Sequence, residues 1–163
     1  GKGPCIDCLA TTYTDEPGRS ACKLAKPGTY VNNTGSSEST TCSAGTYSST
    51  AASYCKICGI GSYSAEGDSE CKLCDAGSSS NARGASECEL CPAGTYKGAG
   101  AGPCIDCPVA TYTDEEGRSE CKLAEPGTYV SEEGSSETTN CSAGTYSSTA
   151  MSSCKVCGIG SYS

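Results

Sequence analysis

The stretch that decides the fold runs from Cys91 to Cys107 and reads Cys-Pro-Ala-Gly-Thr-Tyr-Lys-Gly-Ala-Gly-Ala-Gly-Pro-Cys-Ile-Asp-Cys. It joins a Gly-Thr-Tyr segment to a Gly-rich loop and closes on a Cys-x-x-Cys motif. Variants of this unit follow one another about every 16–17 residues along the whole chain. Such a fixed period is typical of an array in which one small unit is used again and again.

A longer repeat contains the short one. Shifting the sequence by 99 residues lays residues 1–64 over residues 100–163, and only about 15 positions then differ. We interpret residues 1–99 as a first long repeat of six cysteine-rich modules and residues 100–163 as a partial second one. Near-identity between neighbours indicates recent duplication, so we expect the chain to be a window of a longer array.

The composition indicates a fold held by disulfides. The 163 residues include 16 cysteines but no Phe, Trp or His. So few large apolar side chains cannot build an ordinary core, unless covalent links take its place as in small secreted modules. Cysteines at this density predict an extracellular or secretory location.

Charge and hydropathy exclude several partners. The net charge is −8, from 19 acidic and 11 basic residues spread along the modules, which disfavours nucleic acid. The apolar runs are far too short for a membrane-spanning helix, so we expect no membrane insertion in this segment.

Each module predicts a short β-hairpin. Gly-Thr-Tyr-Ser suits a strand of three or four residues, a Gly-centred turn follows, and the chain returns toward the next cysteine. The Gly two residues before Tyr is expected at positive φ, with Thr11 and Ala110 as exceptions. The predicted class is small and disulfide-rich, with tandem hairpin modules stacked into an elongated solenoid and little or no helix.

Seven disulfides follow if the second cysteine of each motif bonds to the first cysteine of the next. The predicted pairs are Cys8–Cys22, Cys42–Cys55, Cys58–Cys71, Cys74–Cys88, Cys91–Cys104, Cys107–Cys121 and Cys141–Cys154. Cys5 and Cys157 remain, and we expect each to bond to a module outside the window.

The modules that lack cysteines support this pairing. Where the register calls for two cysteines, the chain has Ala25 with Ser39 and, one long repeat later, Ala124 with Thr138. Both partners of one bridge are therefore lost together. A rival scheme accounts for the same cysteines. It has a disulfide inside each Cys-x-x-Cys motif, with Cys22–Cys42 and Cys121–Cys141 as the remaining pairs, although a ring closed inside Cys-x-x-Cys is small and strained.

Other chemistry is weakly indicated. Paired Cys-x-x-Cys motifs can hold zinc, but their spacing here is short for a zinc knuckle, and no helix supports a thioredoxin-like role. Without His or a nucleophile motif we predict no enzymatic activity, no catalytic residue and no cofactor or metal. Acidic clusters such as Glu132-Glu133 match no calcium loop, and solvated charge explains them.

Nine tyrosines recur in register and predict a packing ladder, with a surface for sugars or a partner as the alternative. Between the cysteines, the aliphatic of pairs such as Lys56-Ile57 is expected to pack on the neighbouring Tyr while the charge faces water. The ladder comprises Tyr13, Tyr30, Tyr47, Tyr63, Tyr96, Tyr112, Tyr129, Tyr146 and Tyr162.

Two sequons predict N-linked glycosylation, at Asn32 in Asn-Asn-Thr and at Asn140 in Asn-Cys-Ser. They do not occupy equivalent positions of the long repeat. The abundance of Ser and Thr also allows O-linked sugars, for which no fixed motif exists.

The run Cys-x-x-Cys-Pro-x-Gly-Thr-Tyr at Cys88–Tyr96, and a weaker form at Cys55–Tyr63, resembles the ephrin-receptor-like cysteine-rich repeat. The chain is more distantly similar to tumour-necrosis-factor-receptor modules. The resemblance implies an extracellular rod of disulfide loops, as found in receptor ectodomains and in large surface proteins of protists and algae, including those of flagellar hairs (mastigonemes).

From the regular long repeat we predict a structural, non-enzymatic extracellular protein that forms or coats a glycosylated filament or surface appendage. Its expected partners are further copies or other filament chains. The alternative is a ligand-binding segment of a cysteine-rich receptor ectodomain.

Overall fold

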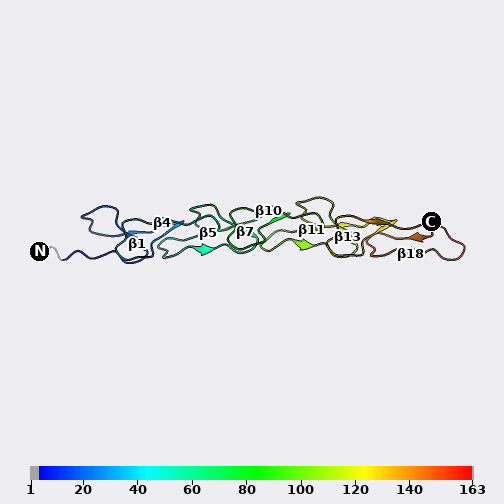
Figure 1. The fold of residues 1–163 in the computed structure, drawn as a ribbon, viewed down its shortest axis with the longest axis horizontal. Helices are drawn as coiled ribbons and strands as arrows, with labels where there is room; N and C mark the ends of the chain where they lie inside the picture. Colours follow the sequence, from blue (N-terminus) through cyan, green and yellow to red (C-terminus); the bar gives the residue numbers. More distant parts are fainter. Residues whose placement is uncertain (1–3, 163) are drawn as a thin grey trace. The chain divides into compact units, whose positions relative to one another are not determined.

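The computed structural model describes residues 4–162, which form nine antiparallel hairpins of two short strands each and contain no helix (Figure 1). The prediction of tandem disulfide-linked hairpins is therefore confirmed. The strands are β1 Thr12–Tyr13, β2 Lys23–Leu24, β3 Thr29–Tyr30, β4 Thr40–Thr41, β5 Thr46–Tyr47, β6 Lys56–Ile57, β7 Ser62–Tyr63, β8 Lys72–Leu73, β9 Ser78–Ser79, β10 Glu89–Leu90, β11 Thr95–Tyr96, β12 Ile105–Asp106, β13 Thr111–Tyr112, β14 Lys122–Leu123, β15 Thr128–Tyr129, β16 Thr139–Asn140, β17 Thr145–Tyr146 and β18 Lys155–Val156.

Cα packing separates the chain into two compact units. The first contains the residues up to Leu73 together with Ala82–Cys88, and the second contains Cys74–Asn81 together with the residues from Glu89 onward. Within the part of the chain that the structure describes, no helix is long and apolar enough to cross a membrane.

The second strand of each hairpin differs from the sequence-based expectation. In most modules it consists of the two residues between the cysteines, so that Thr46 lies opposite Ile57 and Tyr47 opposite Lys56. The first strand is also shorter than predicted, because only Thr and Tyr are extended. The preceding glycine is left-handed, as Gly45 shows with a φ of 82°, and the residue after Tyr turns into the interior, where Ser48 is 1% exposed.

A tight turn leads into each hairpin. In the segment Lys26-Pro27-Gly28-Thr29, Gly28 has a φ of 78°, which matches the third position of a type II turn. Both the amide and the hydroxyl of Thr29 donate to the Lys26 carbonyl, at 3.0 and 2.9 Å. The predicted positive φ is confirmed for the equivalent glycines, and the exceptions Thr11 and Ala110 adopt the same conformation, with φ of 77° and 69°.

Backbone hydrogen bonds join each module to the next within a unit. The Gly45 amide donates to Ser64 O at 2.8 Å, and the Gly67 amide returns a bond to Cys42 O at 2.9 Å. A Cβ added to Gly45 would collide with Gly84 O, two modules further on, at well under the 3.0 Å that real Cβ atoms respect. Glycine is therefore required here by close backbone approach as well as by φ.

The interior is made of sulfur, small side chains and hydroxyl groups. Besides glycines, the buried residues are Cys8, Ala25, Val31, Cys42, Ser48, Cys58, Ser62, Ser64, Cys74, Ser79, Ser80, Cys91, Lys97, Cys107, Thr113, Ala124, Val130 and Ser147. Apart from Lys97, each of these side chains is small.

Candidate functional site

The structure joins sulfurs between successive Cys-x-x-Cys motifs. The disulfides are Cys8–Cys22, Cys42–Cys55, Cys58–Cys71, Cys91–Cys104, Cys107–Cys121 and Cys141–Cys154. Cys74 and Cys88 are disulfide-bonded as well. Cys5 and Cys157 carry free thiols. The bonded sulfurs cannot act as thiolate ligands, and among residues 4–162 no group of three or more metal-binding side chains is present.

The two modules without a disulfide keep the shape of the others. Ala25 and Ala124 are both 0% exposed, and each occupies the buried place that the first cysteine of a bridge has elsewhere, as Cys42 does. The amide of Ala25 donates to Thr11 O at 2.9 Å, just as the amide of Cys42 donates to Gly28 O at 2.9 Å. Backbone bonding therefore holds these modules, while the loop that a bridge would close is left without a covalent link.

The module that begins at Ala25 and the one that follows it line a groove of about 520 Å³. This volume is within the range of about 300–1,000 Å³ that is usual for small-molecule sites. The groove is lined by Tyr30, Asn32, Thr40, Thr41, Ser43, Thr46, Ser53, Tyr54 and Cys55. Two aromatic rings and six hydroxyl- or amide-bearing side chains thus surround one open cavity.

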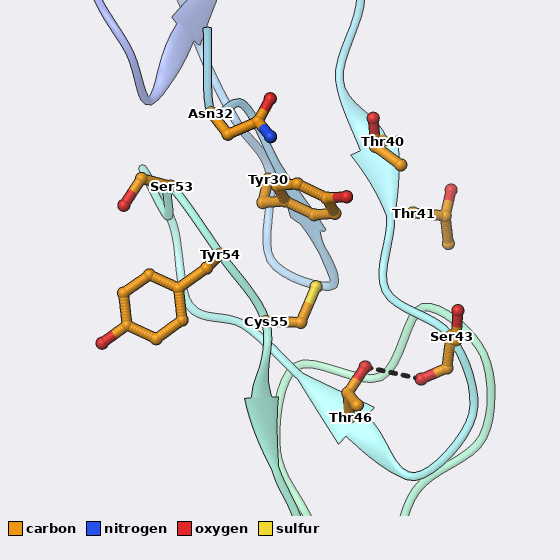
Figure 2. Close-up of a pocket in the computed structure, with 9 residues that line it drawn as sticks. All are labelled: Tyr30, Asn32, Thr40, Thr41, Ser43, Thr46, Ser53, Tyr54 and Cys55. Carbon is orange, nitrogen blue, oxygen red and sulfur yellow. Dashed lines mark hydrogen bonds between the residues drawn. The ribbon is translucent and has the colours of Figure 1, made fainter.

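Figure 2 shows how these side chains lie. Asn32 and Tyr30 both project toward β4, the strand that carries Thr40 and Thr41, whereas the Tyr54 ring points away from them. Tyr30 is half-buried and Asn32 is exposed. The ring and the amide therefore occupy the same wall of the groove, with hydroxyl groups on the opposite wall.

Asn32 also borders a second hollow of about 380 Å³, formed by the loop of its own module from Val31 to Glu38 with Thr40. The Thr34 hydroxyl that completes the sequon is exposed. Both requirements of an acceptor sequon, an accessible amide and an accessible hydroxyl residue on a surface loop, are met at this position.

The second predicted acceptor, Asn140, lies in β16 opposite Thr128 of β15. In the first long repeat the same place belongs to Thr41, opposite Thr29, because 140 minus 99 is 41. Thr41 lines the groove. Asn140 therefore has the strand position that Thr41 has in the first long repeat, across the groove from Asn32.

The tyrosines of the proposed ladder are mostly half-buried, but Tyr146 and Tyr162 are 50% and 96% exposed. The aliphatic residues between the cysteines do not pack as expected. Ile57 and Leu90 remain 57% and 61% exposed, because in most hairpins the Tyr lies opposite the charged residue. Their tips instead approach the turn glycines: a Cβ on Gly117 would be 3.2 Å from Leu90 Cδ2.

Sequence reasoning missed a row of buried hydroxyl groups directly after the tyrosines. Ser48 donates to Thr29 O at 2.8 Å, Ser64 to Thr46 O at 3.0 Å and Ser147 to Thr128 O at 2.6 Å. Each bond links one module to the preceding one. The only sequence signal was the frequent Ser or Thr after Tyr, and its partner is 18 or 19 residues away.

Lys97 occupies this buried position in the module that begins at Cys91. It is 3% exposed, and its Nζ donates long hydrogen bonds to Cys74 O at 3.4 Å and Gly98 O at 3.5 Å. Both acceptors are carbonyl oxygens, so the charge is held without an opposite charge, which is a costly arrangement.

Several acidic residues form exposed ion pairs with lysine. Lys122 Nζ lies 2.6 Å from Asp114 Oδ1, and Lys23 lies 2.7 Å from Asp15 at the equivalent place in the first long repeat. These lysines hold the pKa of Asp114 and Asp15 below the ordinary value of 3.8. The pKa of Asp68 is lowered first by the Ala65 amide and then by Lys72. The interpretation of these clusters as solvated charge agrees with their exposure.

Comparison with known proteins identifies the repeats. Residues 61–99 and 94–141 each match the family described as tyrosine-protein kinase ephrin type A/B receptor-like. These ranges include the Cys88–Tyr96 run that carries the resemblance in sequence. No curated protein shows significant similarity to the chain.

Proposed function

Since residues 61–141 belong to the ephrin-receptor-like cysteine-rich family, a disulfide-rich extracellular class, we propose that the chain is a non-enzymatic structural segment of an extracellular protein. In this role it forms or coats a glycosylated filament or surface appendage, such as a flagellar hair. Further copies of the chain, or other filament chains, are its partners.

The observation that carries this proposal is that the same backbone hydrogen bonds recur from one module to the next. The amide of the glycine before Thr-Tyr donates to the next module at Gly28, Gly45, Gly77, Gly94 and Gly127, over 2.7–3.3 Å. The amide of the following turn residue donates back to the preceding module at Gly67, Gly84, Gly117 and Gly134. Each module contributes the same contacts to its neighbours, as in repeat proteins whose stability is summed along the array. A structural array needs this regularity, whereas a ligand site requires one module that differs.

The receptor-ectodomain alternative rests on the family itself, whose description refers to ephrin receptors. It also has the Tyr30 groove as a local feature that could hold a ligand. In that case the chain presents a binding surface, and self-association has no part in its function.

Sedimentation velocity on the oxidised chain distinguishes the two functions. A filament segment should associate as concentration rises, and added salt should strengthen the association, because each copy carries a net charge of −8 that salt screens. Electron microscopy of the associated sample should then show linear assemblies. A chain that stays monomeric at every concentration and ionic strength would support the receptor function.

A further inference from the structure

The disulfide-free module places an acceptor asparagine and an aromatic ring on one wall of a groove. Asn32 follows Tyr30 by two residues, both side chains line the 520 Å³ hollow, and both point toward β4 (Figure 2). Tyr54 borders the same hollow from another side, with its ring turned outward. Apart from the disulfide-bonded Cys55, the other side chains around the groove offer hydroxyl groups, which can hydrogen-bond to those of a sugar.

We propose that the first N-acetylglucosamine of a glycan on Asn32 folds back into this groove and packs on the Tyr30 ring. Attachment joins the Asn32 amide nitrogen to the anomeric carbon of a lipid-linked sugar diphosphate, with loss of one amide proton and departure of the diphosphate carrier. The sugar's apolar C–H face and N-acetyl methyl lie against the ring, and its hydroxyl groups face Thr40 and Thr41. This inference rests on the glycosylation included in the proposed function, but not on the filament role.

The module's architecture gives the sugar a structural task. A disulfide would otherwise close the loop between positions 25 and 39, where the chain has Ala25 and Ser39. The loop that follows Asn32 is exposed over most of its length. A sugar fixed at Asn32, where this loop begins, and packed on Tyr30 holds the start of the loop against the hairpin β3–β4, and so restrains the segment that lacks its covalent link.

The second long repeat also has an acceptor sequon in its disulfide-free module, at a different position. Ser131 stands where the first long repeat has Asn32, and Asn140 stands where it has Thr41. Asn140 lies in β16, in the register that Thr41 has in β4. Each copy of the disulfide-free module thus has one acceptor sequon in or just after its hairpin strands.

Proton NMR on the full chain, produced oxidised in a eukaryotic secretory host, tests the proposal. An Asn140→Gln background leaves Asn32 as the single predicted N-linked site. The N-acetyl methyl signal of the first sugar should move upfield through the ring current of Tyr30. Tyr30→Phe should keep this shift and Tyr30→Leu should abolish it. Tyr63→Leu removes an equivalent hairpin tyrosine that has no sequon beside it, and should leave the shift unchanged.

Each result has a defined meaning. A glycan present on Asn32 with an unshifted methyl signal, or a shift that survives Tyr30→Leu, overturns the packing and leaves the proposed glycosylated function intact. Mass spectrometry that finds Asn32 unmodified overturns both the packing and the N-linked part of the proposed function at that residue. If Tyr30→Leu fails to fold, nuclear Overhauser contacts between the Tyr30 ring and the sugar in the parent chain decide: their presence supports the packing and their absence refutes it.

Discussion

Replacing Gly45 with alanine should break the contact between alternate modules. The new Cβ would collide with Gly84 O, and relieving the overlap should cost about 1–3 kcal/mol, as overpacking does elsewhere. Alanine at a φ of 82° adds about 1–2 kcal/mol. Loss of the Gly45 amide bond to Ser64 O, at 2.8 Å, adds about 1 kcal/mol. The total is about 3–6 kcal/mol.

Gly127 provides a matched control. It has the same place in its module and a φ of 85°, yet an added Cβ would meet no atom within 4 Å. Gly127→Ala should therefore cost only the conformational term of about 1–2 kcal/mol. The comparison isolates the steric contact from the backbone strain.

Native-state hydrogen exchange of the oxidised chain is the assay, because repeat arrays can open locally. The Cys58 amide bonds to Gly45 O at 3.0 Å and the Cys141 amide bonds to Gly127 O at 2.8 Å. Gly45→Ala should speed exchange at Cys58 by at least about a hundredfold, and Gly127→Ala should speed exchange at Cys141 by about tenfold, since about 1.4 kcal/mol is a factor of ten. Equal effects of the two substitutions would refute the close approach between modules.

Three further predictions concern charge and covalent closure. Lys97→Met removes a buried charge but keeps most of the side chain's volume. It should therefore raise the free energy of unfolding by about 1 kcal/mol, seen as a higher midpoint of denaturant unfolding; a lower midpoint would contradict the structure at Lys97. The folded pKa of Asp114 lies below 3.8, so its pair with Lys122 contributes stability above about pH 4, which is lost as pH falls through that folded pKa. Carboxyl NMR titration of Lys122→Met should show the pKa of Asp114 rising toward 3.8 and that of Asp15 unchanged, whereas an unchanged Asp114 would exclude the ion pair. The double substitution of Ala25 and Ser39 by cysteine should form an eighth bridge and add up to about 3 kcal/mol, measured by thiol titration and chemical unfolding. The titration should still find only the two thiols of Cys5 and Cys157; two additional free thiols would show that this module is shaped differently from its neighbours.

Much of the fold could be predicted because the cysteines, glycines and tyrosines recur at the same place in each module, so equivalent positions can be aligned along the sequence. The glycine two residues before most of the ladder tyrosines predicted a left-handed residue there. Thr11 and Ala110, which replace this glycine in two modules, adopt the same conformation. Joint replacement at Ala25 and Ser39 favoured one scheme of pairing. These features are local or recur every module, so spacing along the chain is enough to find them.

The features that sequence reasoning missed depend on contacts between modules. Ser48 can be buried because its hydroxyl donates a hydrogen bond to Thr29 O of the preceding module, and no spacing rule within one module contains that partner. Ile57 is exposed because the strand register places Lys56, not Ile57, opposite Tyr47. The relation between Asn32 and Asn140 was hidden for the same reason, since the pairing of β3 with β4 and of β15 with β16 is needed to place Asn140 at the strand position of Thr41, which lines the groove with Asn32.

A disulfide map of the non-reduced chain, by proteolysis and mass spectrometry, shows directly which cysteines are bonded. If covalent loops between consecutive motifs hold the fold, the bonded cysteines should be 13 or 14 residues apart, as in Cys91–Cys104 and Cys107–Cys121. Peptides linked within a single Cys-x-x-Cys, or a chain with sixteen alkylatable thiols, would contradict this pairing.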